Sequence, residues 1–475
     1  MAAYDAVVVG AGPNGLAAAI ALAQAGKSVL VVEARDTVGG GCRSAELTLP
    51  GFIHDLCSAF HPLGAASPFF RELDLSREGL EWIEPPAALA HPLDDGTAVL
   101  LERSIDATVA NLGPDARAYR RLVAGLVPEW DHLAADALGP LIRIPRHPFV
   151  MARLGLPGAL PARMLARIAF SGVRARALFG GLAAHSVLPL DAPLTASFAL
   201  MFAVATHVAN WPLPRGGSQR IADALATRLR SLGGTIETGW RVGSLDELEA
   251  ARAYLFDVTP RQLEEIAGPR LSDRYRAKLR SFRYGPGVFK LDYALDGPIP
   301  WRAKDCLRAG TVHLGGTLDE IAESEAQVAR GRPAERPFML VGQQSLFDPS
   351  RAPEGKHTVW AYCHVPNAST FDMTERMEAQ FERFAPGFRD RILARSVMGP
   401  TEVQSHNANY IGGDIGGGAN TMFQFMTRPF FRLDPYATSA RDIYLCSSST
   451  PPGGGVHGMC GYHAARSAMR GVLKH

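Results

Sequence analysis

The sequence predicts an α/β protein in which a nucleotide-binding domain is interleaved with a second domain of antiparallel sheet and helices. Two observations support this prediction. Near the N-terminus, a short β-branched run, a glycine-rich turn and an alanine-rich helical pattern follow one another at the spacing of a nucleotide-binding unit. From residue 287 onwards, strand candidates separated by Gly and Pro are typical of an antiparallel sheet. A chain of 475 residues is long enough for two such domains.

The N-terminal unit is a Rossmann-type dinucleotide fingerprint. The apolar run Ala6–Val9 is too short for a helix, and alanines and leucines at helical spacing begin only after the glycine-rich turn. In such a turn the first glycine makes the sharp bend, the second lets a pyrophosphate approach the backbone, and the third lets the helix lie close to the strand. Free amides at the start of the helix then face the phosphates. The turn residues that we expect at the cofactor are Gly10, Gly12, Pro13, Asn14 and Gly15.

The second strand of this unit, Val29–Val32, ends at Glu33. Glu33 lies about 20 residues past the glycines, where a carboxylate accepts hydrogen bonds from a ribose diol and disfavours a 2′-phosphate. Ala34 and Arg35 follow directly, and we expect them beside the cofactor as well.

Composition indicates a globular protein and gives no reason to expect nucleic acid. The chain is 47% hydrophobic and 20% charged, with a net charge of only +2. The six cysteines form no CxxC pair and no metal-ligand spacing, so we expect free thiols in a reducing compartment and no metal. A strand that begins by Asp5 leaves no room for a signal peptide, which predicts a cytoplasmic location.

The continuation of the fingerprint indicates which nucleotide is bound. The stretch Arg35-Asp-Thr-Val-Gly39-Gly40-Gly41-Cys42-Arg43 resembles the superfamily of flavin amine oxidases and phytoene desaturases. In that superfamily the second glycine cluster and the following arginine hold the diphosphate and flavin side of FAD. The resemblance therefore implies FAD as the cofactor and adds Gly40, Gly41, Cys42 and Arg43 to its site.

The C-terminal segment 443–466 is similar to that of phytoene-dehydrogenase-related oxidoreductases, including the carotenoid desaturase and isomerase branch. The resemblance implies a strand to Cys446, a loop past the isoalloxazine ring, and a helix beginning near Gly458 whose N-terminal dipole stabilises the reduced flavin. Most of the family has glycine where this chain has Ser447. The implied cofactor contacts are Ser447, Ser448, Gly455, Val456 and Met459, and His457 and Met459 are also candidate catalytic residues.

The middle of the chain indicates where it enters and leaves the FAD domain. The order of Pro214, Gly216 and Gly217, a helix, Gly233-Gly234 and a strand at 235–238 looks like the point of return in the superfamily, which implies that Val242 lies near the adenine. The stretch Ala253–Pro260 matches a further strand. These segments predict a discontinuous, three-layer FAD-binding domain of residues 1–70, 211–285 and 405–475. Residues 71–210 and 286–404 then form the substrate domain with its helical cap.

Two helical stretches of the cap have sequence patterns that also occur in helices that span or contact a membrane. The run Ala196–Ala209 contains no charge, but its alanines, Thr206 and His207 predict a buried helix rather than a membrane span. Four arginines alternate with apolar residues between 163 and 178, a basic amphipathic pattern that can rest on a lipid surface or form an ordinary solvated face. These arginines are Arg163, Arg167, Arg174 and Arg176.

Lys290 is the third candidate catalytic residue. The chain has only six lysines, and Lys290 shares one face of a predicted strand with Val288 and Asp292. Flavin amine oxidases place a lysine on a comparable strand, hydrogen-bonded through water to flavin N5. The alternative is a surface lysine on an edge strand.

His61 follows the loop 50–60, which the resemblance places near the flavin. His61 is therefore a candidate for a supporting role at the flavin, and the alternative is a histidine that only caps or packs.

The leading functional hypothesis is an FAD-dependent oxidoreductase that acts on C–C bonds of a long apolar polyene or lipid by dehydrogenation, saturation or isomerisation. The chain lacks a CxxxxC pair, which makes the disulfide-reductase type of flavoprotein a poor match. An amine or amino-acid oxidase that uses oxygen is the alternative enzyme. A flavin-carrying structural or regulatory protein is the alternative of another class.

Overall fold

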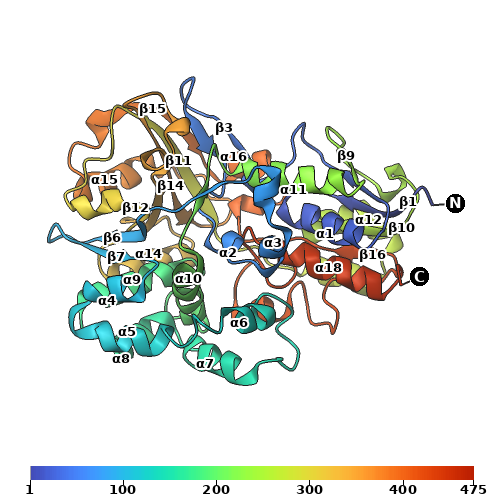
Figure 1. Ribbon diagram of the computed structural model, residues 1–475, viewed down its shortest axis with the longest axis horizontal. Helices are drawn as coiled ribbons and strands as arrows, with labels where there is room; N and C mark the ends of the chain where they lie inside the picture. The colour runs from blue at the N-terminus through green and yellow to red at the C-terminus, as the bar shows by residue number, and fades with distance from the viewer. Residues whose placement is uncertain (1, 475) are drawn as a thin grey trace.

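The computed structural model describes residues 2–474. Figure 1 shows two sheets side by side. The cap helices α4 to α10, within residues 105–209, are gathered below the sheet that contains β11 (Gly287–Leu295) and β14 (His357–Val365). Both chain ends lie at the far end of the other sheet, beyond β1. The chain crosses between the two halves several times, so the domains are interleaved, as the sequence predicts.

The first sheet is wholly parallel, with the strand order β16-β10-β1-β2-β9. Its strands are β1 (Tyr4–Val9), β2 (Val29–Val32), β9 (Thr235–Glu237), β10 (Ala251–Phe256) and β16 (Ile443–Leu445). Because side chains alternate along a strand, Ala6 and Val8 face one layer of apolar side chains whereas Val7 and Val9 face another. The first layer is formed by α1 (Pro13–Gln24), α11 (Gln219–Ser231) and α18 (Met459–Arg470). The second is formed by α12 (Pro260–Ala267), α13 (Asp273–Arg280) and residues 242–248, which gives three layers.

The second sheet is antiparallel except for one pair, with the order β15-β11-β14-β13-β12-β6-β7. Its strands are β6 (Ala87–Pro92), β7 (Ala98–Leu101), β11 (Gly287–Leu295), β12 (Ala309–Leu314), β13 (Met339–Gly342), β14 (His357–Val365) and β15 (Ile392–Met398). One face packs Phe289, Leu291 and Tyr293 against α15 (Thr374–Phe384). The opposite face, with Val288, Trp360 and Tyr362, packs toward the cap and the first domain.

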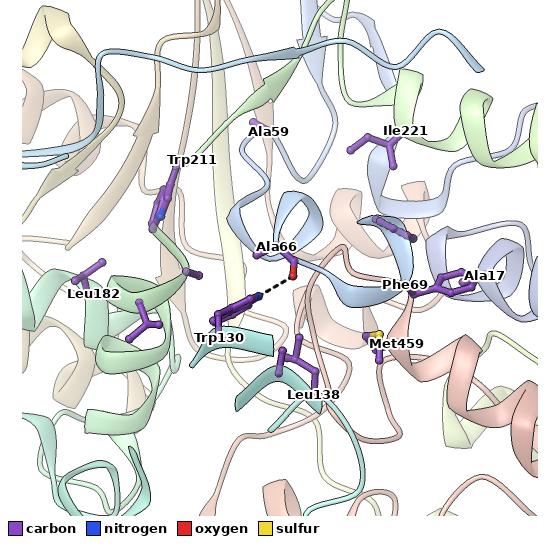
Figure 2. Packing of buried hydrophobic residues seen from close by; sticks show 14 of the residues in the cluster. Ala17, Ala59, Ala66, Phe69, Trp130, Leu138, Leu182, Trp211, Ile221 and Met459 are labelled. Carbon is purple, nitrogen blue, oxygen red and sulfur yellow. Dashed lines mark hydrogen bonds between the residues drawn. The ribbon is translucent and has the colours of Figure 1, made fainter. Parts of the chain in front are cut away.

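The cap is continuous with the core of the nucleotide-binding domain. Figure 2 shows Trp130 and Leu138 of the cap in the same apolar cluster as Ala17, Phe69 and Met459. The indole Nε1 of Trp130 donates a hydrogen bond to the carbonyl of Ala66 at 3.0 Å. The cap helices are α4 (Ile105–Ala110), α5 (Ala116–Val123), α6 (Trp130–Ala137), α7 (Pro148–Gly158), α8 (Ala162–Ala169), α9 (Val173–Ala184) and α10 (Thr195–Ala209).

Short elements connect the two halves. Strands β3 (Ser44–Glu46) and β4 (Ile53–Asp55) form a hairpin, and β5 (Trp82–Ile83) pairs with β8 (Leu213–Pro214). The remaining helices are α2 (Pro62–Ala65), α3 (Pro68–Leu73), α14 (Leu318–Ala329), α16 (Pro400–His406) and α17 (Met422–Thr427). Between residues 2 and 474, no helix has both the length and the apolar character needed to cross a membrane.

The structure corrects several predicted elements. Strand β10 ends at Phe256, because Thr259 caps α12 and Pro260 occupies its first turn. The sequence interpretation missed β6, whose alanines have low strand propensity, and β15, an edge strand with only half-buried side chains. Each strand of the two sheets falls in the segment predicted for its domain, but the exact domain boundaries stay predictions.

The four cap arginines are held by the protein. Arg163 and Arg167 both pair with Asp319, and Arg174 donates to the carbonyls of Asn111 and Ala98. Arg176 donates to the carbonyl of Phe170. These contacts favour the interpretation as an ordinary solvated face.

Candidate cofactor and substrate site

A cleft of about 270 Å³ connects the glycine-rich turn after β1 with the cap side of the antiparallel sheet. At one end it is lined by backbone of the fingerprint and of the second glycine cluster. At the other end it is lined by aromatic side chains from the sheet, the cap and the loop after β4. The predicted cofactor residues that line it are Gly12, Pro13, Asn14, Gly40, Gly41, Ser447, Ser448, Gly455 and Val456. The cleft therefore brings together three predicted segments from the two ends of the chain.

The glycines of these segments stand where no side chain fits. A Cβ on Gly15 would lie 1.9 Å from the carbonyl oxygen of Gly10, where α1 crosses β1. A Cβ on Gly41 would lie 2.1 Å from the Oη atom of Tyr410. Gly10 and Gly40 have φ angles of +103° and +53°, which side chains rarely adopt. A ligand can therefore approach the backbone closely on both sides of the cleft.

Glu33 and Arg43 form a buried ion pair behind the glycine turn. The Oε1 atom of Glu33 lies 3.0 Å from Nη2 of Arg43, and Oε2 accepts from the amide of Ala11 at 2.8 Å. Arg35 donates its amide to Glu33, and its guanidinium reaches the carbonyl of His406. A carboxylate has about four acceptor positions, so Glu33 keeps capacity for a ribose hydroxyl. Neither Glu33, Ala34, Arg35 nor Arg43 lines the cleft.

Asp257, at the end of β10, is a site residue that the sequence interpretation missed. Its Oδ2 atom accepts a hydrogen bond from the amide of Gly15 at 2.9 Å, and the residue lines the cleft beside Gly12. Burial raises the pKa of Asp257 to about 7, with the Gly15 hydrogen bond opposing the shift. The available signal was its place at the C-terminal end of a parallel strand, where ligands of α/β sheets bind.

The C-terminal loop is fixed by a buried arginine. Arg428 donates to the carbonyls of Ser448 at 2.9 Å and Gly418 at 2.7 Å, which joins the loop after β16 to the glycine-rich segment 412–418. The Nδ2 atom of Asn14 lies 3.4 Å from Oγ of Ser448, so the fingerprint contacts this loop directly. The Oδ1 atom of Asn14 is buried and has no hydrogen-bond partner among the described residues.

The structure does not bring His457 and Met459 to the cleft. His457 is buried, its Nδ1 accepts from the amide of Met459 at 3.1 Å, and its carbonyl accepts from Oγ of Ser67. Burial lowers the pKa of His457 to about 4, so the ring is neutral at neutral pH. Met459 packs in the apolar cluster of Figure 2. These side chains stabilise the turn at Gly458, where α18 begins.

Four other predicted cofactor contacts also lie away from the cleft surface. Val242 packs against the second face of the parallel sheet. Cys42 is buried with its Sγ 3.6 Å from Oγ of Ser58, and burial raises the pKa of its thiol to about 12. Gly10 and Gly15 shape the turn from behind. All six cysteines are free thiols in the described chain.

Lys290 is buried, so the interpretation as a surface lysine on an edge strand is wrong. Strand β11 lies between β14 and β15, and Lys290 is only 3% exposed. The side chain lines a separate cavity of about 10 Å³, large enough for about one water molecule. Tyr362 and Tyr410 line both this cavity and the main cleft. Lys290 therefore lies in a cavity that shares lining residues with the cleft.

Two histidines line the cleft. The Nε2 atom of His61 lies 2.9 Å from Oγ of Ser218, and burial lowers the pKa of His61 to about 4. His185 of the cap lies with its Nε2 atom 3.1 Å from Nε2 of His313, and its pKa is about 3 for the same reason. Both rings are neutral at neutral pH. Neither can act as a cationic general acid there without a large change in surroundings.

The residues present fit a dinucleotide with a flavin ring. The close backbone approach at Gly12 and Gly40 matches a diphosphate. The unpartnered amide oxygen of Asn14 and the buried carboxylate of Glu33 are acceptors that match sugar hydroxyls. Within the described residues, no group of three or more His, Cys, Asp or Glu side chains is arranged to hold a metal ion.

Comparisons with known proteins agree with this geometry. Residues 8–73 match the family model of an NAD(P)-binding Rossmann-like domain. Pyridine nucleotide-disulfide oxidoreductase domain-containing protein 2 of Mus musculus is 25% identical over 98% of this chain and 93% of its own length. The neurosporene-forming phytoene desaturase of Rhodobacter capsulatus is 26% identical over 96% of this chain and 92% of its length.

A solved structure shares the whole fold. An engineered putrescine oxidase superposes with a TM-score of 0.62 and 19% identity, with 99% of each chain covered. This likeness supports the two interleaved sheets and does not by itself indicate a substrate. From its fingerprint and these relatives, the chain is an FAD-dependent oxidoreductase that resembles the phytoene-dehydrogenase-related enzymes.

Proposed function

We propose that the chain transfers hydride to or from C–C bonds of a long apolar substrate, as a desaturase, saturase or flavin-assisted isomerase of polyenes or other lipids. One observation supports the proposal most directly. Beyond the cofactor segments, large apolar side chains line the cleft, and no acidic side chain of the described residues lines it there. The apolar wall consists of Phe60, Leu63, Phe202, Trp211, Leu340 and Trp360. Among residues 2–474, the one carboxylate that lines the cleft is Asp257, at the fingerprint end.

When bound, FAD supplies a two-electron acceptor for the hydride. The contribution of this chain is orientation and exclusion of water. The aromatic wall holds an apolar chain against the cofactor segments, and neutral His61 and His185 add no charge that would disfavour it. Lys290 holds a water in the small cavity at the edge of the cleft, where a proton is delivered or removed.

The amine-oxidase alternative requires an aromatic cage and a charged anchor. Tyr362, Tyr410 and Trp360 line the cleft and meet the first requirement. The second is not met at the substrate end, because a cationic amine buried without an acidic partner is strongly disfavoured. A disulfide substrate is disfavoured as well, since burial raises the pKa of Cys57, which lines the cleft, and of Cys42.

The proposal is tested by extraction of lipid from the purified yellow protein, with mass spectrometry to identify it. An apolar polyene or lipid that copurifies and reduces the flavin anaerobically supports it. Flavin reduction by amines, but by no lipid, supports the oxidase instead. Flavin that only dithionite reduces supports a structural or regulatory carrier.

We further propose that one face of the cap contacts a membrane from which the substrate enters. Two segments expose large apolar side chains: Ile144, Phe149 and Leu156 are 92%, 89% and 76% exposed, and Phe423 and Leu433 are 70% and 89% exposed. Arg146 and Arg153 are exposed in the first segment, which fits an anionic lipid surface. We call the five exposed apolar residues the apolar surface patch.

The two segments of the apolar surface patch meet at the start of α10. A Cβ on Gly158 of α7 would lie 3.0 Å from Cβ of Ser197, and the rings of Phe198 and Phe425 are 5.4 Å apart. About one turn further along α10 than Phe198, Phe202 lines the cleft. Helix α10 therefore links the patch to the substrate end of the cleft.

Flotation with phosphatidylcholine vesicles, with and without phosphatidylserine, tests the contact. We expect flotation that phosphatidylserine increases and that Phe149→Ser with Leu156→Ser abolishes. Exposed Leu393 lies on the edge strand β15, so Leu393→Ser serves as the control. Absence of flotation in wild type at low salt contradicts the membrane proposal and leaves the enzymatic one standing. A cytoplasmic location stays a prediction.

A further inference from the structure

A buried ion pair stands behind the water-sized cavity. Asp292 follows Lys290 by two residues on β11, so both side chains lie on the same face of the sheet. The Nζ atom of Lys290 donates to Oδ2 of Asp292, and the Asp292 side chain is fully buried. A lysine has four rotatable side-chain bonds, and this contact fixes its amine at the cavity.

The second oxygen of Asp292 faces a histidine from the hairpin. The Nδ1 atom of His54 on β4 lies 3.6 Å from Oδ1 of Asp292. Both atoms are buried, and neither has a hydrogen-bond partner in the described part of the chain. A buried polar atom without a partner costs about 1–3 kcal/mol. A proton on Nδ1 faces this oxygen and gives both atoms a favourable electrostatic contact, at a distance longer than a hydrogen bond.

The other ring nitrogen of His54 determines which atom carries the proton. Nε2 lies 2.8 Å from Oγ1 of Thr48, whose hydroxyl can donate to it. Burial lowers the pKa of His54 to about 3, with Lys290 and Arg351 adding to the shift, so the neutral ring carries a single N–H. With that N–H on Nδ1, His54 directs its proton toward the Asp292 carboxylate and accepts from Thr48. The other tautomer would set a lone pair against the carboxylate.

We propose that Asp292 and His54 are positioning residues for Lys290: His54 orients the carboxylate of Asp292, and Asp292 holds the Lys290 amine at the water-sized cavity beside the cleft. The inference rests on the proposed role of Lys290 in proton delivery. It assigns a function to the hairpin β3–β4, which contains His54 but does not itself reach the cleft.

Other charged groups surround the same carboxylate. Arg351, between β13 and β14, pairs with Asp55 of β4 at 2.8 Å, and all atoms of both side chains are buried. Burial is the main cause that raises the pKa of Asp292 to about 6, and Asp55 adds to it, whereas Lys290 and Arg351 act in the opposite direction. The carboxylate is therefore ionised at neutral pH and becomes protonated as the pH falls through about 6.

The test uses reoxidation, which needs no knowledge of the substrate. Holoprotein reduced with dithionite is mixed with oxygenated buffer in a stopped-flow instrument, and flavin absorbance is followed between pH 5 and pH 9. We expect Lys290→Met to slow reoxidation about tenfold, the usual scale for one positioned proton-transfer group. Asp292→Asn should slow it similarly and remove the break in the pH profile near the pKa of Asp292.

A matched pair of variants isolates His54. His54→Asn keeps an N–H donor at the position of Nδ1, whereas His54→Gln keeps one near Nε2, next to Thr48. The proposal expects His54→Gln to lose most of the rate and His54→Asn to recover it. Glu46→Gln, a change of an exposed side chain on the same hairpin, is the control, and its rate should equal that of wild type. Flavin content and circular dichroism verify that each variant folds.

Nitrogen NMR of His54 gives a readout independent of catalysis. We expect the Nδ1–H tautomer in wild type and a changed Nδ1 shift in Asp292→Asn. An Nε2–H tautomer overturns the arrangement outright. Normal reoxidation in His54→Gln, with slow reoxidation in Lys290→Met, overturns the positioning role and leaves that of Lys290 intact. Normal reoxidation in Lys290→Met contradicts the proposed role of the lysine and overturns the positioning role with it.

Discussion

The carboxylate of Asp257 accepts a hydrogen bond from the amide of Gly15 at 2.9 Å, inside the turn where a dinucleotide places its diphosphate. The two residues are 242 positions apart in the sequence. They meet because β10 pairs directly with β1 in the parallel sheet. An acid in this place makes cofactor binding sensitive to pH.

We expect FAD to bind more tightly below pH 7 than above it. The pKa of Asp257 is raised to about 7, so the group is neutral at low pH and becomes a buried anion beside the diphosphate as the pH rises. The same shift means that the stability of the FAD-free protein declines as the pH rises toward 7. Fluorescence titration of the FAD-free protein at pH 6 and pH 8 measures the difference.

Asp257→Asn is the matched variant for this prediction, because its amide oxygen still accepts from Gly15. The variant should bind FAD with nearly equal affinity at both pH values. A pH dependence as large as that of wild type would place the titrating group elsewhere.

Glu33→Ala should weaken FAD retention by about 1.5–3 kcal/mol, the scale of a hydrogen bond to a charged group. The change removes a ribose acceptor and also leaves Arg43 without its ion-pair partner. Glu33→Gln keeps the shape and separates the contribution of charge. Equal FAD occupancy of wild type and Glu33→Ala at limiting cofactor would refute the ribose assignment.

Gly41→Ala should reduce FAD occupancy, because the new Cβ would lie 2.1 Å from the hydroxyl oxygen of Tyr410 and must displace it. In Gly41→Ala with Tyr410→Phe, the nearest ring atom is 3.5 Å away, an ordinary contact. The double variant should therefore regain part of the occupancy that the single variant loses. Absence of any recovery would show that Gly41 is needed for the cofactor itself.

The flavin should be bound noncovalently. Precipitation with acid should release it into the supernatant, since no thiol in the described chain has a lowered pKa and the cleft-lining histidines are neutral. Flavin that stays with the precipitate would contradict this expectation.

Sequence patterns predicted those parts of the site whose residues are contiguous in the chain. The fingerprint from Gly10 to Gly15 is recognisable because strand, turn and helix are contiguous in the sequence. Asp257 escaped notice because its role depends on the order of strands in the sheet. The side chains of His457 and Met459 turn into the core because α18 packs closely on α1, where a Cβ on Gly461 would lie 1.8 Å from the carbonyl of Asn14.

Lys290 shows what sequence can and cannot decide. Alternation correctly placed it on one face with Val288 and Asp292, but an edge strand and an interior strand have the same alternation. Only the pairing of β11 with both β14 and β15 shows that the lysine is buried. Likewise, no local signal connects Asp292 with His54, because the hairpin and β11 meet only in the folded chain.

The most direct test of the proposed function is anaerobic titration of the FAD-bound protein with apolar and cationic substrates. A detergent-dispersed polyene and a primary amine are added separately while the oxidised flavin band is recorded. We predict that the polyene bleaches the band, or is isomerised over reduced flavin, and that the amine leaves both unchanged. Bleaching by the amine, with no change of the polyene in either flavin state, would contradict the assignment to C–C bond chemistry.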